Sequence, residues 1–550
     1  MNKFTKQCVA AFASLAMAGT LCVAGAVVVG NSAWAADTCN NQAPWNTACK
    51  AQKGKITINK KDSSDGNKPL NGAIFTIQKV TLIKSDNDPT GLSVDLTSFD
   101  GWTKLAAKVK QLNSTPLDET KLILGDVKEK TTEGQGQAVF DNVDLGLYLV
   151  KEKSAPTNYA TDVKPFFMTV PEITRAKEST SNTYTYEVSV DPKNNNVKDN
   201  VTKTADSGKI VGAGDTLPYT ITAKVNKKKS DAADSDKGIT KDELKGFAVF
   251  DDAVTDAYES VDTGVVKEVS IGDSKLENSN GKTYYNVEKE SHDNSKSDSP
   301  EADRTRIKVT FTQDGLEKIA TAVNDANNAD VSVKVKLELK LKNDLSNFTG
   351  SDKKLTNKSG FVPGHGDGVP DKIIPGGSAD NEFRKFHILK VNGTDSNKTI
   401  KDAEFKAFAG DEGEASKEIA QKCANDPTGD NCNSALSGFG TKKTGDSGTT
   451  DDYSAKVGQT FYLVEVKAPE GFVRSTKVYE VKLETAANNA QAQVVTIENV
   501  PTKDNVSWFK LPKTGAYGVI IFALAGMCLV AVGMFIFLRN RKNDEEQQAA

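Results

Sequence analysis

Apolar and polar residues alternate along short runs through most of the chain between about residue 50 and residue 500. The clearest run covers residues 331–341, where every second residue is Val or Leu and the residues between them are mostly charged. A period of two is typical of a strand with one buried face. Shorter runs of this kind cover residues 56–58, 184–190, 219–222 and 494–497. Because turns rich in Gly, Asn and Asp separate the runs, the pattern predicts an all-β protein of immunoglobulin-like β-sandwiches in series.

Helices are expected to be a minor part of this fold. The best helical candidates are residues 314–324 and 414–422. At roughly 150 residues per domain, the 550 residues allow three or four domains, each large enough to bury a core. The Gly- and Pro-rich stretches 363–368 and 375–377 are predicted to form a linker before the last domain.

The N-terminus has the three parts of a secretory signal peptide. Lys3 and Lys6 precede an apolar stretch over residues 8–30, and the small residues Ala33 and Ala35 follow it. This order predicts that residues 1–35 are removed on export. The mature protein is therefore expected outside the cytoplasm.

The C-terminus has a charge-free run over residues 516–538, followed by a tail over 539–550 that starts with basic residues. A helix of that length spans the hydrocarbon core of a bilayer, and the cations stay on the cytoplasmic side. Just before it, in region 506–515, stands Leu-Pro-Lys-Thr514-Gly515. The order of pentapeptide, apolar span and basic tail resembles the cell-wall sorting signal of Gram-positive surface proteins. The resemblance implies that a sortase cleaves between Thr514 and Gly515.

The charge balance narrows the function further. The chain has 70 basic and 74 acidic residues, a formal net charge of -4, and 3 His. This balance provides no basic surface for nucleic acid and few groups for a metal or proton-transfer centre. The loop 293–297 matches the spacing of a metal-ion-dependent adhesion site, but a polar segment precedes it where that site needs an apolar strand. We therefore predict no enzyme, no cofactor and no metal site; a structural calcium ion in the Asp- and Asn-rich loops stays open.

Four of the seven cysteines remain in the exported part of the chain, because Cys8 and Cys22 lie in the signal peptide and Cys528 lies in the C-terminal span. Four cysteines allow three pairings. The pairing of near neighbours suits the domain layout best. The sequence therefore predicts two disulfides in an oxidising compartment, which join Cys39 to Cys49 and Cys423 to Cys432.

Two parts of the chain repeat the same order of features. Each has a strand that ends in Lys, a strand with Ala-x-Phe, and an aromatic-x-aliphatic-x-Glu segment followed by Ala-Pro. The matching segments are 56–60, 69–75 and 148–159 in the first part, and 386–390, 400–405 and 461–472 in the second. These parts resemble CnaB-type immunoglobulin-like domains, and the Glu segments resemble the E-box of Gram-positive pilins. The segment 201–357 between them resembles the larger middle domain of the same proteins.

A further motif narrows the family. Residues 184–193, Tyr-Thr-Tyr-Glu-Val-Ser-Val-Asp-Pro-Lys, are similar to the pilin motif, with Tyr184 in place of Trp and Asp191 in place of Tyr. With the sorting signal and both E-boxes in order, the chain is identified as a member of the SpaA-type backbone pilins. The resemblance implies three domains, over residues 36–193, 194–378 and 379–505.

The family resemblance also implies a role in a surface polymer. Lys193 is expected to accept the acyl group from Thr514 of another copy, which makes a fibre of identical subunits joined head to tail. The implied partners are pilin-specific and housekeeping sortases, accessory pilins and peptidoglycan. The protein is then a secreted, wall-anchored pilus subunit of a Gram-positive bacterium that supports adhesion.

In domains of this family, a Lys of the first strand and an Asn of the last strand condense into an amide, assisted by a carboxyl group. Burial favours the neutral amine and the protonated acid that the reaction needs. The resemblance assigns one such set to each domain, with Asp252 as an alternative acid in the second and Lys61 as an alternative amine in the first. The sets are Lys60, Glu152 and Asn194; Lys203, Asp251 and Asn357; and Lys390, Glu465 and Asn499.

An alternative interpretation makes the protein an accessory pilin or a wall-anchored adhesin. Its ligand site would then lie in the long insertions over residues 80–124 or 270–301. The sequence names no host ligand. Lys193 distinguishes the two interpretations, because the shaft subunit alone needs it for polymerisation.

Overall fold

The structure is a computed structural model. It describes residues 39, 41–86, 88–112, 117–161, 163–176, 179–206, 212–225, 238–278, 281–325, 331–349, 353–365, 371–485, 491–502 and 516–547. The predicted signal peptide and the pentapeptide that contains Thr514 and Gly515 lie outside these residues. The chain forms two compact units, Met1–Phe383 with Thr485–Ala490, and Arg384–Glu484 with Gln491–Ala550. Each unit is described by itself below.

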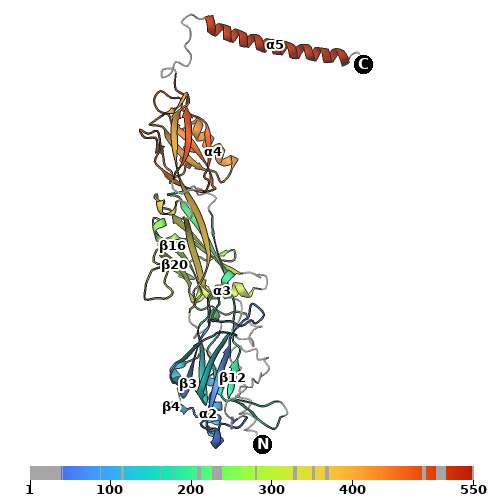
Figure 1. The fold of residues 1–550 in the computed structure, drawn as a ribbon, viewed down its shortest axis with the longest axis vertical. Helices are drawn as coiled ribbons and strands as arrows, with labels where there is room; N and C mark the ends of the chain where they lie inside the picture. The colour runs from blue at the N-terminus through green and yellow to red at the C-terminus, as the bar shows by residue number, and fades with distance from the viewer. Residues whose placement is uncertain are drawn as a thin grey trace. The chain divides into compact units, whose positions relative to one another are not determined.

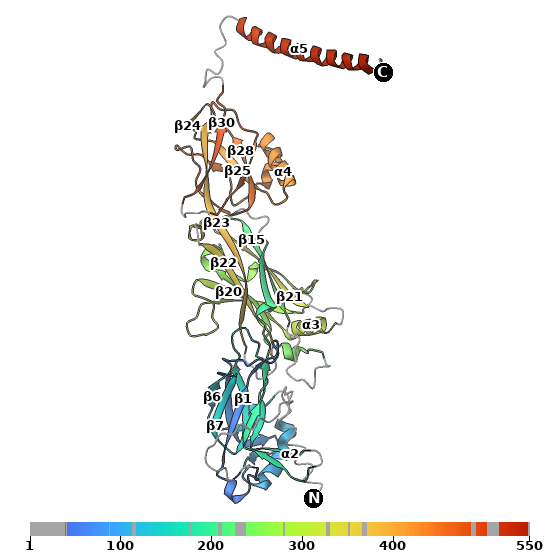
Figure 2. The ribbon, with the colours of Figure 1, turned by 45° about the vertical axis from the view of Figure 1, so that its right-hand side comes forward.

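The first part of unit 1 contains a three-stranded sheet in the order β12-β1-β7 and a larger sheet built on β3 and β8. Strands β1 and β7 lie side by side (Figure 2). Strand β1 pairs in parallel with β12 and antiparallel with β7. The elements here are η1 (Thr47–Cys49), β1 (Lys53–Asn59), β2 (Lys61–Asp62), β3 (Ile74–Ser85), β4 (Asp88–Ser93), α2 (Phe99–Leu112), η2 (Glu119–Lys121), β5 (Leu122–Leu124), β6 (Lys128–Thr131), β7 (Gln137–Asp144), β8 (Gly146–Ser154), β9 (Phe166–Val170), β10 (Glu172–Thr174), β11 (Thr183–Thr185), β12 (Glu187–Val190), β13 (Lys193–Asn194) and η3 (Lys198–Asn200).

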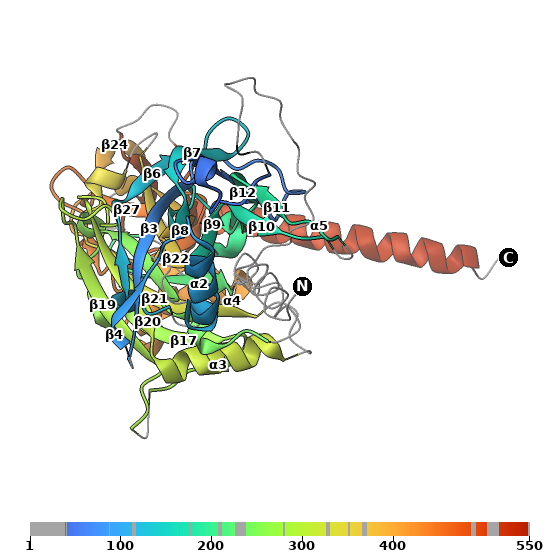
Figure 3. The ribbon, with the colours of Figure 1, turned by 90° about the horizontal axis from the view of Figure 1, so that it is seen from below.

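Strand β8 divides the core of this part into two clusters. Tyr148 and Val150 face a cluster shared with β1 and β7, whereas Leu147 and Leu149 face a cluster that contains Trp102 of α2. Successive side chains of a strand point to opposite faces, so β8 buries both of its faces. Figure 3 shows α2 beside β8 and β9. The helix therefore forms an outer layer over the sheet.

The second part of unit 1 has a five-stranded sheet in the order β14-β15-β21-β17-β18 and a second sheet in which β19, β20, β16, β22 and β23 are consecutive neighbours. Strands β16 and β20 lie side by side (Figure 1). The elements here are β14 (Val201–Ala205), β15 (Thr216–Lys224), η5 (Lys241–Leu244), β16 (Ala248–Val254), η6 (Thr255–Ala257), η7 (Thr263–Val265), β17 (Val266–Ile271), β18 (Ser274–Lys275), β19 (Tyr285–Ser291), β20 (Arg304–Phe311), α3 (Gln313–Asn324), β21 (Ser332–Lys340), η8 (Ser346–Phe348) and β22 (Lys354–Val362).

Unit 2 repeats the strand pairing of the first part. Its first strand, β23, pairs in parallel with its last strand, β30, and β25 pairs with β28. Helix α4 packs on Tyr462 and Val464 of β28, in a cluster that includes Cys423 and Cys432. The elements are β23 (Ile374–Asn392), β24 (Asp395–Thr399), β25 (Glu404–Ala409), α4 (Glu414–Asn425), η9 (Asp430–Ser434), β26 (Lys442–Lys443), β27 (Tyr453–Lys456), β28 (Thr460–Lys467), β29 (Val478–Lys482) and β30 (Gln493–Asn499).

Strand β23 runs without a break across the expected linker. Pro375 and Gly376 belong to this strand, where Lys354 to Phe361 of β22 pair with it across one register shift. The sequence had suggested a linker over residues 375–377. This prediction is wrong, because the residues belong to a strand. Gly377 has a φ of 72°, and a Cβ there would approach the backbone N of Lys203 to 2.8 Å. The glycines allow a bulged strand to pass close to β14.

Four of the five predicted strands and both predicted helices are present, as β1, β15, β21, β30, α3 and α4. The fifth predicted run, 184–190, divides at Tyr186 into β11 and β12, which pair with β10 and β1. Helix α2, in the insertion 80–124, was not predicted from the sequence. Trp102, Leu105 and Leu112 of α2 are buried, and Trp102 and Leu105 have the three-residue spacing of one helix face. That spacing was the signal that could have found it.

Helix α5 (Ala516–Gln547) covers the predicted membrane span. Its side chains are exposed over residues 523–539. Within the part of the chain that the structure describes, no helix is both long and apolar enough to cross a membrane.

Candidate functional site

In unit 2, Lys390, Glu465 and Asn499 meet in the core. The Lys390 Nζ donates to the Asn499 Oδ1 at 2.7 Å, and the Asn499 Nδ2 donates to the Glu465 Oε1 at 2.7 Å. The same Glu465 oxygen lies 3.4 Å from the Lys390 Nζ. Both charged side chains are fully buried, with the Nζ 5.4 Å from the centre of the Phe405 ring. Burial lowers the pKa of Lys390 to about 8.

The second carboxylate oxygen of Glu465 also has a partner. The backbone N–H of Ser475 donates to its Oε2 at 2.7 Å. Sequence analysis missed Ser475, because it lies in the loop between β28 and β29, where no alternation or motif marks it. This hydrogen bond fixes the orientation of the carboxyl group between the lysine and the amide.

In the first part of unit 1, Lys60, Glu152 and Asn194 have the same arrangement. The Lys60 Nζ donates to the Asn194 Oδ1 at 2.6 Å, and the Asn194 Nδ2 donates to the Glu152 Oε1 at 2.8 Å. The Lys60 Nζ lies 3.1 Å from the same Glu152 oxygen, and 5.4 Å from the centre of the Phe75 ring. The Glu152 Oε2 is buried without a hydrogen-bond partner. Lys61, the alternative amine, instead pairs with Asp191 at 2.6 Å.

The two clusters arise from the same strand register. Lys390 lies opposite Ile497 in the parallel pair of β23 and β30, so Asn499 stands two residues farther along. In the pair of β2 and β13, Lys61 lies opposite Lys193, which places Asn194 two residues beyond the position opposite Lys60. Side chains two residues apart share a face. Parallel pairing of the first and last strands thus brings Lys and Asn together.

The middle cluster, in the second part of unit 1, is arranged differently. The Lys203 Nζ donates to the Asp251 Oδ2 and, at 3.1 Å, to the backbone carbonyl of Lys358. The Asn357 Nδ2 lies 3.4 Å from the same Asp251 Oδ2. The Asn357 Oδ1 and the Asp251 Oδ1 are buried without hydrogen-bond partners. The lysine therefore contacts the acid, whereas in the other two clusters it also contacts the amide oxygen.

Burial controls the charges of the middle cluster. It lowers the pKa of Lys203 and raises the pKa of Asp251, although each partly offsets the shift of the other. The ring of Tyr219 lies 4.7 Å from the Lys203 Nζ, and its hydroxyl is 2.8 Å from the hydroxyl of Tyr258. Burial thus favours a neutral amine beside a neutral acid, whereas the contact with the Tyr219 ring favours the charged amine.

Asp252, the alternative acid, lies on the other face of β16. Its two carboxylate oxygens accept from the Arg306 Nε at 2.7 Å and Nη2 at 2.9 Å. The pleat of the strand decides between the two neighbouring acids. Asp251 faces Lys203 and Asn357, whereas Asp252 is held by an arginine.

All three clusters share one chemically useful feature. A single carboxyl oxygen contacts both the lysine nitrogen and the amide nitrogen: Glu152 Oε1, Asp251 Oδ2 and Glu465 Oε1. Such an oxygen is placed to take a proton from an attacking amine and to deliver it to a departing one. The arrangement is suited to condensation of Lys and Asn.

Lys193 lies next to the first cluster but on the other side of the strand. It is half-buried in β13, whereas Asn194, the next residue, is fully buried. The carboxylate of Asp191 accepts from Asn59 and Lys61, at 2.9 and 2.6 Å. The neighbouring acid is thus bound to other groups.

The structure contains the two disulfides expected from the sequence. Cys39 bonds to Cys49 with a Cα–Cα distance of 5.5 Å, and Cys423 bonds to Cys432 with a Cα–Cα distance of 4.9 Å. Among the described residues, no group of three or more His, Cys, Asp or Glu side chains is placed to hold a metal ion.

Comparison with known proteins identifies two family matches. The SpaA prealbumin-like fold domain matches residues 54–185 and 384–500, and the LPXTG cell wall anchor motif matches residues 509–545. The first matches contain Lys60, Glu152 and the complete cluster of unit 2. The chain therefore has two SpaA-type prealbumin-like domains and a cell-wall anchor.

Two curated proteins are similar over most of their length. Fimbrial subunit type 1 of Actinomyces viscosus is 26% identical over 507 residues, covering 86% of this chain and 85% of that protein. Fimbrial subunit type 2 of Actinomyces naeslundii is 24% identical over 563 residues, covering 90% of this chain and 91% of that protein.

Two solved structures share the fold. The full-length major pilin SpaD from Corynebacterium diphtheriae has a TM-score of 0.50 and 22% identity, with 82% of this chain and 98% of that chain covered. The major pilin SpaA from the same organism has a TM-score of 0.52 and 20% identity, with 82% of this chain and all of that chain covered. The all-β fold of immunoglobulin-like domains predicted from the sequence is thus confirmed.

Proposed function

We infer that this chain is a sortase-assembled major pilin, the backbone subunit of a covalent, wall-anchored pilus on a Gram-positive surface. It is a structural subunit and not an enzyme. The observation that carries this function is the combination, in one chain, of an LPXTG anchor with prealbumin-like domains whose cores each hold a buried Lys, acid and Asn. The similarity to fimbrial subunits over most of the chain supports it.

We propose that Thr514 of one subunit becomes joined to Lys193 of the next. A sortase thiol replaces the amine of Gly515 on the Thr514 carbonyl carbon, and the Lys193 amine then replaces the thiol. One amide is broken and one is formed, so the exchange needs no other reactant. The proximity of Lys193 to Asn194 supports this role, because a strand held by a buried neighbour presents the lysine from a fixed position.

Each buried cluster is proposed to close an internal amide. The neutral Lys Nζ attacks the Asn side-chain carbonyl carbon, and the carboxyl oxygen passes the proton of the amine to the Asn Nδ2. The carbon–Nδ2 bond then breaks and ammonia leaves. In the clusters of Lys60 and Lys390, the short contacts between Lys Nζ and Asn Oδ1 support this reaction. In the middle cluster, the buried acid Asp251 supports it.

The polymer is tested by Lys193→Ala in the native host. We expect the high-molecular-weight ladder on denaturing gels to disappear, while the monomer remains folded and is still anchored to the wall. Peptide mapping of wild-type polymers should recover one peptide that links Thr514 to Lys193. Ladders that survive in Lys193→Ala would overturn the backbone role and favour the accessory pilin or adhesin.

A matched control is Lys198→Ala, which removes an exposed lysine five residues farther along the same segment. Its ladder should be unchanged. The internal amides are tested separately, by intact mass of the mature chain. Each closed bond lowers the mass by one ammonia, and a chain without such losses would exclude all three bonds while leaving the polymer assignment intact.

A further inference from the structure

One arginine joins the two strands that carry the acid and the amide of the middle cluster. The ladder between β16 and β22 ends at the pair Asp252 and Lys358. Just beyond this last pair, the side chain of Arg304 reaches across β16 from the first position of β20. Its Nη1 donates to the backbone carbonyl of Asp252 at 2.8 Å and to that of Thr356 at 3.0 Å. The guanidinium thus connects β16 to β22 just beyond the last paired residues of the two strands.

The two carbonyls belong to the residues next to the reacting groups. Asp251 precedes Asp252, and Asn357 follows Thr356. An increase in the separation of these carbonyls would therefore move the acid and the amide apart. The Asn357 Nδ2 to Asp251 Oδ2 distance is already 3.4 Å, which is long for a hydrogen bond. A shift of a few tenths of an ångström would break the contact through which the proton must pass.

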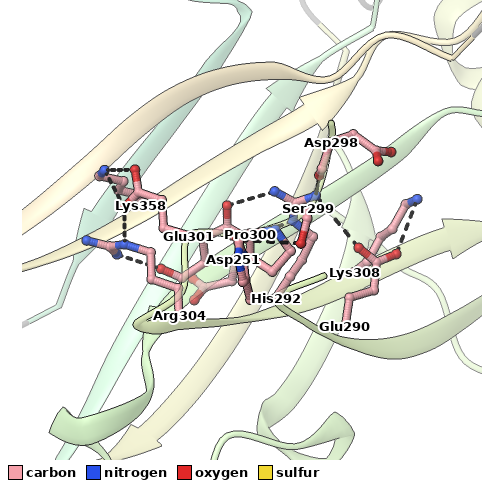
Figure 4. Close-up of polar contacts among 12 residues, drawn as sticks. Asp251, Glu290, His292, Asp298, Ser299, Pro300, Glu301, Arg304, Lys308 and Lys358 are labelled. Carbon is pink, nitrogen blue, oxygen red and sulfur yellow. Dashed lines mark hydrogen bonds and ion pairs between the residues drawn. The ribbon is translucent and has the colours of Figure 1, made fainter. Parts of the chain in front are cut away.

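Arg304 is itself held in place. Its Nε donates to the Glu301 Oε2 at 2.9 Å, and the Lys358 Nζ donates to both oxygens of Glu301, at 2.7 and 2.9 Å. Figure 4 shows Lys358 and Arg304 directed at Glu301, from β22 and from β20, the strands on either side of β16. Arg304 is 8% exposed. The polar loop over residues 292–303 therefore supplies the carboxylate that orients the arginine.

A second arginine keeps the neighbouring acid out of the reaction. The Arg306 guanidinium binds both oxygens of Asp252, and its Nη1 donates to the backbone carbonyl of Asp298 at 2.7 Å.

Burial is the main cause of the lowered pKa of Lys203, and the positive charge of Arg304 acts in the same direction. Both effects favour an uncharged lysine facing one acid.

We propose that Arg304 is a positioning residue for amide formation in the middle cluster, acting by fixing the distance between the strands of Asp251 and Asn357. This inference rests on the proposed function, because it requires that Lys203 and Asn357 condense. It also gives the loop over residues 292–303 a role that its sequence did not indicate. Arg304 itself contacts no reacting atom.

The test is Arg304→Gln in the full mature chain, recovered unfolded and unclosed, then refolded and quenched at intervals. Mass spectrometry of peptides measures each of the three bonds. We expect the Lys203–Asn357 bond to form at least tenfold more slowly, while the other two bonds form at wild-type rates and serve as internal standards. Lys308→Gln is the matched control, because Lys308 lies on β20 at 3.7 Å from Glu290. It should close all three bonds normally.

A conservative variant separates positioning from general loss of structure. Arg304→Lys keeps a charge that can donate to the two carbonyls and should recover part of the rate lost in Arg304→Gln. The proposal would be contradicted if the Lys203–Asn357 bond formed at the same rate in the two variants while hydrogen exchange showed both to be folded. So would wild-type closure in Arg304→Gln.

If Arg304→Gln does not fold, Glu301→Gln tests the positioning role of Arg304 instead. It leaves the guanidinium in place but weakens its anchor, and it should slow the middle bond about threefold; an unchanged rate overturns the inference. The wild-type chain is measured first. If its Lys203–Asn357 bond is absent while Thr514 is linked to Lys193, the middle reaction and this inference fall together, and the pilus assignment stands.

Discussion

The first and third clusters have the same geometry but different places in the proposed polymer. In both, the Lys Nζ contacts the Asn Oδ1, at 2.6 Å for Lys60 and 2.7 Å for Lys390. A polymer joined through Lys193 and Thr514 carries tension along the backbone between these two residues. The proposed amide between Lys390 and Asn499 would lie on that path and shorten it. Nearly all of the chain enclosed by the bond between Lys60 and Asn194 lies before Lys193 and outside the path.

This difference separates two effects of a covalent bond. Closing a loop stabilises a domain by reducing the entropy of its unfolded state, wherever the domain stands in the polymer. Resistance to stretching depends instead on whether the bond lies between the points where force is applied. We expect both bonds to contribute to stability. Of the two, we expect only the bond between Lys390 and Asn499 to limit the extension of the polymer.

Stretching of polymers released from the wall gives the largest expected difference. Asn499→Ala should allow residues 390–499 to unfold under force, a sequence separation of 109. At about 3.4 Å per residue, each such event releases roughly 370 Å of chain. Asn194→Ala should show no new event, because its loop is not under tension. Single-molecule force spectroscopy measures both, and equal release by the two variants would refute the proposed force path.

Thermodynamic stability should respond equally to the same two changes. Loss of either bond is expected to lower the free energy of unfolding of its domain by about 5 kcal/mol, by the chain-entropy model for loops of this size. The sequence separations of 134 and 109 give a difference of only about 0.2 kcal/mol. Denaturant-dependent hydrogen exchange, followed by peptides from each domain, measures both values.

Asn196→Ala, which removes an exposed asparagine beside the first cluster, is the control for these measurements. This variant should be within about 1.5 kcal/mol of the wild type, because it loses the hydrogen bond from the Lys198 N–H to Asn196 but no proposed amide. A stable Asn194→Ala would mean that the first bond does not form.

Each disulfide should contribute less than an amide bond. Cys423 and Cys432 are 9 residues apart, so the loop that they close is short. Cys423→Ala with Cys432→Ala should lower stability by about 3 kcal/mol, measured by the same exchange experiment with the Lys390–Asn499 bond intact. A loss as large as that of Asn499→Ala would contradict this expectation and show that the disulfide contributes as much as the amide to the stability of unit 2.

The pH dependence of bond formation gives the smallest expected effect. Burial lowers the pKa of Lys390 to about 8, and only the neutral amine attacks. Below that pH the neutral fraction falls about tenfold per unit, so closure of the third bond should slow by the same factor. Refolding of unclosed chain at pH 6, 7 and 8, with peptide mass spectrometry, measures the rate. A rate independent of pH would show that loss of the lysine proton does not limit closure.

Much of the fold followed from local sequence patterns. Alternation over residues 331–341 identified β21, and the paired Lys, Ala-x-Phe and Glu segments identified the repeated domains. Helix α2 was missed, although it lies between β3 and β8 along the chain, much as α4 lies between β25 and β28. Both helices cover the outer face of the strand that carries the Glu. This likeness was hidden, because the two insertions share position and packing but no residue motif.

The candidate site was predicted unevenly for a physical reason. The residue types of each cluster were assigned by resemblance to a known family. The choice between Asp251 and Asp252 required the pleat of β16, and the second oxygen of Glu465 required a loop that folds back to supply the N–H of Ser475. Such contacts depend on how distant segments pack, and no local pattern encodes them.

The sequence by itself determined the order of strands and domains, the cell-wall anchor, the cysteine pairs and the residues able to form internal amides. The strand runs and the cysteine pairs follow from composition or from short-range spacing, whereas the anchor, the domains and the proposed amide-forming residues were assigned by resemblance to a known family. Tertiary structure decided which face of each strand is buried, the parallel register that sets Asn two residues beyond Lys, and the place of Arg304 between two carbonyls. The reason is that the proposed reaction depends on differences of a few tenths of an ångström in the contact distances between side chains that are more than 100 residues apart in sequence.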